Sequence, residues 1–219
     1  MPNFILSASA GPGPEPVCVI TACTWLRAGL EGLLTSPGRR DVRFLTAPDD
    51  GLIAAAGLSG AALVCHLPAR LGSALDTLFF VAACLAPGRR EAWRRIVLLT
   101  DLPPCWLFDV LHALTEDAAV AGGVEVVSLR KDVAVLQAVL TGDVLVPLSA
   151  QTRRLWRCAL TAAELEVLRA LLCRQQSFVA VARVRGTEIN TIKAQKQTAF
   201  LKLRVRTWSG ALNWRGDGF

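Results

Sequence analysis

The sequence has no long apolar run. The longest, residues 78–86, is far shorter than the roughly 20 residues that a membrane-spanning helix needs. The first basic residue is Arg27, so no basic segment precedes the short apolar patch at residues 4–6, as a secretory signal would require. We therefore expect a cytoplasmic chain without a membrane partner.

Motifs for metals, cofactors and catalysis are also missing. The seven cysteines contain no C-x-x-C, and several lie inside apolar stretches, as expected of buried free thiols. A disulfide framework or a zinc site is the alternative. No G-x-G-x-x-G follows the first apolar run, and no nucleophile has a base beside it in a known motif. We expect no enzymatic activity, no cofactor and no metal. The cysteines are Cys18, Cys23, Cys65, Cys84, Cys105, Cys158 and Cys173.

Charge divides the chain into two unequal parts. Residues 151–219 carry thirteen Lys or Arg against four Asp or Glu, a net charge of +9. Residues 1–150 carry eleven against fourteen, a net charge of −3. A small basic end on a mildly acidic body indicates that the end meets a polyanion. Charge alone does not separate DNA from RNA or an acidic membrane.

Short apolar runs alternate with amphipathic ones from residue 17 onward. The runs are rich in Val, Ile and Leu and do not alternate with polar residues, which is typical of a parallel sheet covered on both faces. Five such units predict a doubly wound, five-stranded parallel α/β sheet. The predicted strands are residues 17–22, 42–46, 61–65, 96–100 and 124–128, and the helices 25–34, 49–57, 75–85, 106–118 and 132–140.

The last part of the chain has a helical pattern. Thr161 and Glu164 form a capping-box signature before an apolar stripe, and three further helices are predicted at residues 178–184, 188–203 (with Thr187 as its cap) and 207–214. We predict a flexible tail at 1–16, a sheet domain at 17–140, a linker at 141–159 and an all-α four-helix domain at 160–219.

Two stretches in this part resemble a known family. Residues 160–169, LTAAELEVLR, resemble the opening of the LuxR/NarL-type helix-turn-helix domain, and residues 191–203, TIKAQKQTAFLKL, resemble its recognition helix. The pair Gln195-Lys196 is most similar to the capsule-synthesis (Rcs-type) response regulators. Two positions depart from the family pattern. Its glycine between the first two helices falls near Gln175, and its apolar residue at the end of the second helix falls on Arg185 or Val184.

The sheet domain resembles the receiver that precedes such heads. Residues 26–30, LRAGL, lie where receivers begin their first helix, and Thr100 and Lys131 stand at the receiver's hydroxyl and lysine positions. The acidic residues are replaced, because the paired carboxylates fall on Thr21 and Ala22 and the phosphate-accepting aspartate falls on His66. Phosphorylation needs a carboxylate nucleophile and Mg²⁺ held by carboxylates. The resemblance therefore implies a pseudo-receiver with His66 at a degenerate phosphoacceptor position, which we expect in a loop.

The third helix of the head carries the predicted DNA contacts. Ile189, Ile192, Ala199 and Leu203 should pack inward. The polar residues left outside suit base edges and phosphates, because amides read adenine and lysines read guanine or phosphate. These are Asn190, Thr191, Lys193, Gln195, Lys196, Gln197 and Lys202. Arg204, Arg153 and Arg154 should contact phosphates, although the two linker arginines could equally serve solubility.

The sequence therefore predicts a DNA-binding transcription regulator that needs no phosphorylation. One head reads few base pairs, so we expect a homodimer, or a heterodimer with a related regulator, held chiefly through residues 17–140. Trp208 and Trp214 on the last helix could line a second contact or pack within the head. An interaction protein that pairs with a true response regulator is one alternative. A flavodoxin-like small-ligand binding protein is the other.

Overall fold

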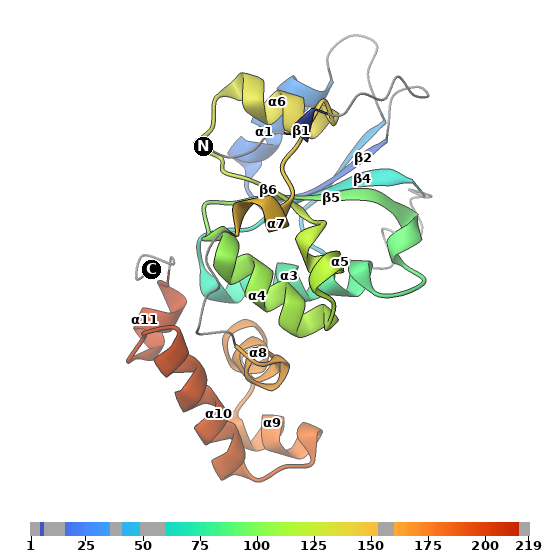
Figure 1. The fold of residues 1–219 in the computed structure, drawn as a ribbon. Coiled ribbons are helices and arrows are strands. Elements are labelled where there is room, and N and C mark those ends of the chain that lie inside the picture. The colour runs from blue at the N-terminus through green and yellow to red at the C-terminus, as the bar shows by residue number, and fades with distance from the viewer. Residues whose placement is uncertain (1–4, 7–15, 36–40, 49–59, 153–159, 215–219) are drawn as a thin grey trace.

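A computed structural model of the chain describes residues 5–6, 16–35, 41–48, 60–152 and 160–214. It contains a five-stranded parallel sheet with helices on both faces, followed by a helical domain (Figure 1). The fold class predicted from the sequence is therefore confirmed. The helix expected at residues 49–57 lies outside the described residues.

The sheet has the strand order β3-β2-β4-β5-β6, with every neighbouring pair parallel. Each strand corresponds to one predicted apolar run, and the three central strands are largely buried because helices cover both faces. The strands are β2 (Val17–Ile20), β3 (Val42–Leu45), β4 (Ala61–His66), β5 (Trp93–Leu99) and β6 (Glu125–Val127).

Successive strand residues face opposite layers of helices. Val19 and Val64 belong to the apolar core shared with α1 (Thr24–Leu34) and α6 (Val133–Thr141). Cys18 and Leu63 belong to the core on the other face, where three helices pack (Figure 1). Those helices are α3 (Leu71–Leu85), α4 (Pro104–Thr115) and α5 (Ala118–Gly122), and the short 3₁₀ helix η1 (Arg90–Ala92) precedes β5.

The predicted tail and the start of the predicted linker contribute to the sheet domain. Strand β1 (Ile5–Leu6) pairs antiparallel with β7 (Val144–Leu145), and α7 (Leu148–Gln151) follows. Leu148 is fully buried, and the Gln151 amide donates to the carbonyls of Val126 and Val146 at 2.8 and 3.2 Å. Gly142 and Pro147 suggested a linker, but the apolar residues around them pack onto the sheet.

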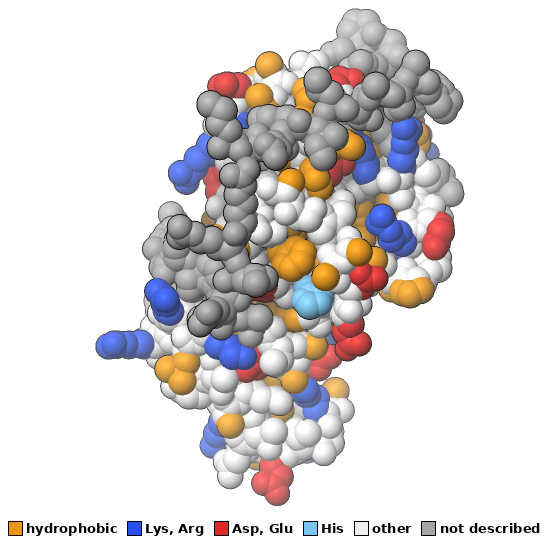
Figure 2. Space-filling view, viewed as in Figure 1, with side chains coloured by type: hydrophobic (Ala, Val, Ile, Leu, Met, Phe, Trp, Pro, Cys, Tyr) orange, Lys and Arg blue, Asp and Glu red, His pale blue; other side chains and the backbone are white. Residues whose placement is uncertain are grey.

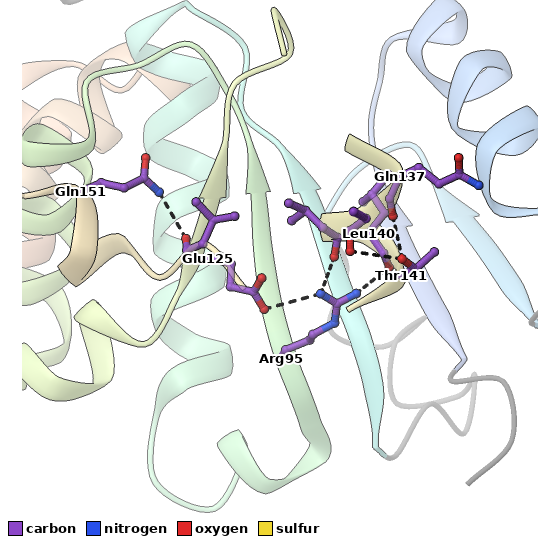
Figure 3. Close-up of polar contacts among 9 residues, drawn as sticks. Arg95, Glu125, Gln137, Leu140, Thr141 and Gln151 are labelled. Atoms are coloured by element: carbon purple, nitrogen blue, oxygen red, sulfur yellow. Dashed lines mark hydrogen bonds and ion pairs between the residues drawn. The ribbon is translucent and has the colours of Figure 1, made fainter. Parts of the chain in front are cut away.

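A buried ion pair joins β5, β6 and the end of α6 (Figure 3). The Arg95 guanidinium lies 3.5 Å from the Glu125 carboxylate, and both side chains are at most a tenth exposed. Arg95 also donates to the carbonyls of Val139 and Leu140, which the end of α6 leaves without helical partners. This one cation thus fixes α6 against the sheet.

The helical domain comprises α8 (Ala162–Leu168), its π-helical continuation η2 (Arg169–Cys173), α9 (Phe178–Arg185), α10 (Ile189–Lys202) and α11 (Trp208–Leu212). The predicted capping box is confirmed, since the Thr161 hydroxyl accepts from the Glu164 N–H and the Glu164 carboxylate accepts from the Thr161 N–H. The predicted Thr187 cap is wrong. Glu188 is the N-cap of α10 and makes no side-chain cap bond.

The two departures from the family pattern have simple local outcomes. Gln175 adopts a left-handed backbone with φ 50°, a conformation that favours glycine. Arg185, and not Val184, points inward, because its guanidinium donates to the Ala163 carbonyl at 3.0 Å while Val184 is 79% exposed. The end of α9 therefore keeps its packing position with a polar residue there.

The head packs on the face of the sheet domain formed by α3 and α4. Arg169 pairs with Asp76 at 2.8 Å and lies over the Phe79 ring at 4.5 Å, both on α3. The rings of Trp106 on α4 and Trp214 are 4.8 Å apart, so Trp214 packs between the domains. In the part of the chain that the structure describes, no helix has the length and apolar character of a membrane crossing.

Candidate nucleic-acid interface

The buried side of α10 follows the predicted spacing with one exception. Ile192, Ala199 and Leu203 are buried, as predicted, and they hold the helix against α8 and α9. Ile189 was expected to pack inward but is 37% exposed, because it occupies the first turn of the helix, beyond the head's core. Phe200, which the prediction missed, is buried instead.

Four of the predicted contact residues share the exposed side of α10. Asn190, Thr191, Lys193 and Gln197 are all exposed, and they fall along one side of a helix that turns every 3.6 residues. Three further residues on this side were missed, because their chemistry is apolar or weakly polar. These are Ala194, Thr198 and Leu201. We call these seven residues the α10 outer face.

Gln195 and Lys196 lie at the margins of the helix, where the prediction expected open surface. The Lys196 ammonium sits 4.8 Å from the Phe200 ring centre and 5.5 Å from that of Trp208, so α11 borders it. Gln195 is half-buried, and its side-chain oxygen has no hydrogen-bond partner among the described residues. The structure thus places both residues outside the α10 outer face.

Lys202 is engaged inside the head. Its ammonium lies 2.8 Å from the carboxylate of Glu164, which is itself buried in the capping box. A buried carboxylate needs such a cation because leaving it unpaired is costly. The expectation that Lys202 points outward is therefore wrong for this structure, and the ion pair ties the end of α10 to the start of α8.

Basic residues surround the helix. Lys and Arg side chains stand out from the head in the lower part of Figure 2. Arg204 and Arg206 directly follow α10 and are exposed. The predicted phosphate contacts Arg153 and Arg154 lie outside the described residues.

The carboxyl ends of β2, β4 and β5 bring together the positions at which receivers carry their phosphorylation chemistry. The Cys23 N–H donates to the Thr21 hydroxyl oxygen at 3.1 Å, and that hydroxyl lies 3.2 Å from Nδ1 of His66. Its proton therefore points to Nδ1, which requires an imidazole unprotonated at that nitrogen. Burial lowers the pKa of His66 below its ordinary 6.5, in the same direction. His66 ends β4 and does not lie in a loop, as had been expected.

The rest of this edge is occupied by neutral or already paired groups. The buried Thr100 hydroxyl accepts from the Leu102 N–H at 3.1 Å, and Ala22 is exposed. Asp101, which the prediction missed, accepts from the Ser128 hydroxyl at 2.6 Å and pairs with Arg130 at 3.1 Å. Among the described residues, no three His, Cys, Asp or Glu side chains form a group that could hold a metal ion.

The six described cysteines form no disulfide. Burial raises the pKa of Cys18 and of Cys173 to about 11, so both are thiols at neutral pH. The Cys173 thiol donates to the Gly72 carbonyl at 3.0 Å across the domain contact. Cys158 lies outside the described residues.

Comparison with solved structures finds chains of the same architecture. RcsB from Salmonella enterica serovar Typhimurium bound to promoter P1flhDC is similar with a TM-score of 0.56 and 18% identity, over 94% of this chain and all of that one. The same protein bound to promoter rprA gives 0.54 and 20%, over 94% and 99%. A complex of the two-component response regulator RcsB with DNA gives 0.53 and 17%, over 93% and 100%.

At these identities the likeness shows a shared fold. The architecture expected from the family resemblance, a receiver-like sheet domain followed by a helix-turn-helix domain, is thereby confirmed. No protein-family model matches the sequence, and no curated protein matches it.

Proposed function

We propose that this chain is a sequence-specific DNA-binding transcription regulator, and not an enzyme. The observation that carries the proposal is the α10 outer face, a row of amide, hydroxyl and lysine side chains on an exposed helix of a basic head. A helix of this size fits the major groove, where such side chains read base edges. The solved RcsB complexes have the same fold and are bound to promoters, which supports this use of the head.

Within the head we assign two kinds of contact. Asn190, Lys193 and Gln197 read bases, with Thr191 at the flank of the same surface. Lys196, Arg204 and Arg206 contact phosphates, together with Arg153 and Arg154 before the head. Phosphate contacts contribute affinity without sequence preference and make binding dependent on salt. Gln195 and Lys202 support the helix from its inner margins.

The sheet domain acts as a pseudo-receiver that needs no phosphorylation. The reason is chemical, because Thr21, Ala22 and His66 offer neither a carboxylate nucleophile nor a carboxylate pair for Mg²⁺. The hydrogen bond between Thr21 and His66 occupies the place where an acyl phosphate would form. The domain serves instead for pairing or for signal input.

Pairing through the sheet domain supplies the second head that specific binding requires. Helices α1 and α6 lie side by side on the face opposite the head (Figure 1), and each begins with an exposed apolar residue. Trp25 is 87% exposed and Val133 is 61% exposed. We place the contact of a homodimer, or of a heterodimer with a related regulator, on this face. Trp214 is already buried against Trp106, which removes it from a head-to-head contact in this conformation.

Binding of genomic DNA fragments by the purified full-length chain tests the proposal. We expect a recurrent sequence among the bound fragments. Lys193→Ala should weaken binding to it about tenfold, from the loss of one base or phosphate contact. Lys131→Ala is the matched control, since Lys131 is an exposed lysine of the sheet domain. Equal effects of the two variants would contradict the assignment of α10 as the reading helix.

Sedimentation of the full-length chain tests the pairing. We expect a dimer without any modification, and we expect Trp25→Glu to shift it toward the monomer by placing a charge in the contact. A wild-type chain that stays monomeric at micromolar concentration, on DNA as well as off it, would remove the homodimer. Sedimentation with a related regulator would then decide whether the chain works as a heterodimer.

A further inference from the structure

The α10 outer face contains no arginine, and most of its area is amide or methyl. Asn190 and Gln197 supply the amides, while Ala194, Thr198 and Leu201 supply the apolar groups. Leu201 is 68% exposed, which is unusual for a leucine with no apolar neighbour to cover it. The chemistry of this face therefore differs from the basic surface around it.

The cations near the helix do not add a guanine reader at its centre. Lys193 lies at one flank of the face. The Lys196 ammonium lies over the Phe200 and Trp208 rings, and Lys202 is paired with Glu164. Bidentate recognition of guanine is the work of Arg or Lys, whereas Asn and Gln pair with the N6 and N7 atoms of adenine. The centre of the face is thus equipped for adenine.

Thr198 completes the partner base. Its hydroxyl donates to the Ala194 carbonyl at 3.0 Å, so the hydroxyl is used within the helix and the methyl is the apolar end of an exposed side chain. Together with the Ala194 methyl one turn earlier, it forms an apolar strip between the amides. In the major groove, the C5-methyl of thymine is the base group that such a strip contacts.

We propose that this head selects half-sites with A·T base pairs at their centre, with Asn190 and Gln197 on adenines and Ala194 and Thr198 on thymine methyl groups. This specificity rests on the proposed DNA-binding function and names its substrate more closely. Leu201 extends the apolar strip toward the end of the helix, where it covers the next thymine or the adjoining sugar. Lys193 contacts the flank of the half-site.

The test replaces thymine by uracil. Half-sites are first selected from random duplexes by the full-length chain, and each thymine is then exchanged singly for uracil, which removes the methyl group and keeps every hydrogen-bonding atom. We expect a loss of about fourfold in affinity at one or two thymines, the effect of uncovering one methyl-sized apolar group. Thr198→Ser removes the matching methyl from the protein and keeps the hydroxyl that bonds to Ala194.

A double-mutant cycle then identifies the contact. At the thymine that Thr198 touches, the uracil penalty should vanish in Thr198→Ser and persist at the other thymines. Half-sites with G·C centres, or indifference to uracil at every position, would overturn this inference while leaving DNA binding intact. A chain that selects no sequence at all would overturn the proposed function, and this inference with it.

Discussion

The α10 outer face and the carboxyl edge of the sheet are the two polar surfaces that matter most in a regulator of this fold, and they differ in what they retain. On α10, Asn190, Lys193 and Gln197 are exposed and point away from the head's core. At the sheet edge, Thr21 and His66 bond to each other, and Asp101 is engaged by Ser128 and Arg130. One surface is open to a partner, whereas the other is closed on itself.

The difference teaches that a fold constrains its two sites separately. The strands that would carry a phosphorylation site remain in order and register, because apolar residues on both faces of the sheet hold them there. The chemistry of the edge depends only on the residues at the strand ends, which can change without loss of packing. Function must therefore be argued from each site and not from the shared architecture.

Removing the amides from α10 should give the largest effect. We expect the double variant Asn190→Ala/Gln197→Ala to lower the free energy of specific binding by about 2–6 kcal/mol, at about 1–3 kcal/mol for each bidentate contact. Binding to random DNA should change little, because phosphate contacts remain. Fluorescence anisotropy with a specific and a scrambled duplex measures both. A variant that loses affinity equally for the two duplexes would contradict base reading by these residues.

Restoring acidic residues to the sheet edge should bring the two surfaces closer in character. Ala22→Asp/His66→Asp places two carboxylates at neighbouring strand ends, where they can bind Mg²⁺. We expect Mg²⁺ at about ten times its dissociation constant to stabilise the variant by about 1.4 kcal/mol in thermal unfolding, with no effect on the wild type. Stabilisation of the wild type by Mg²⁺ would show that the edge still binds the cation.

The closed edge should also leave a signature in the pH dependence of stability. Burial lowers the pKa of His66 in the folded state, so the unfolded chain takes up a proton first as the pH falls below about 6.5. The free energy of unfolding should fall over this range and level off once folded His66 is protonated as well. His66→Gln should remove this component, whereas His112→Gln on α4 should leave it. Identical profiles for the two variants would rule out the Thr21–His66 pair as its source.

The smallest effect concerns the frame of α10. Gln175 has φ 50° between η2 and α9, where glycine is free of steric strain. We expect Gln175→Gly to raise the free energy of unfolding by about 0.5 kcal/mol, because relief of strain slightly exceeds the extra chain entropy. Urea denaturation measures it, with Gln176→Gly as the control that should be neutral or destabilising. The affinity for DNA should stay unchanged.

Much of the fold could be predicted from the sequence because it depends on local patterns. The apolar strand runs predicted the five parallel strands, and the spacing of Thr161 and Glu164 predicted the capping box. The segment around Gly142 and Pro147 was predicted as linker because its signals for breaking structure are strong. Its place on the sheet depends on the burial of Leu148, which only the tertiary structure shows.

The site was harder to predict because helix margins depend on neighbours. Helical spacing separated Ile192 from Asn190, but it could not show that the rings of Phe200 and Trp208 lie beside Lys196. Nor could it show that buried Glu164 holds Lys202, since the two residues are far apart in the sequence. Residues without strong polarity, such as Ala194 and Thr198, gave no signal until the exposed face was known.

The central claim is that the open surface works while the closed one stays silent, and the affinity of the full-length chain for its selected DNA tests it directly. The measurement is made with and without beryllofluoride and Mg²⁺, with the mass of the protein checked after acetyl phosphate treatment. The account predicts the same affinity in both conditions and no added phosphoryl group. A gain of about fivefold or more, the size of ordinary coupling between sites, or a stable acyl phosphate would contradict it.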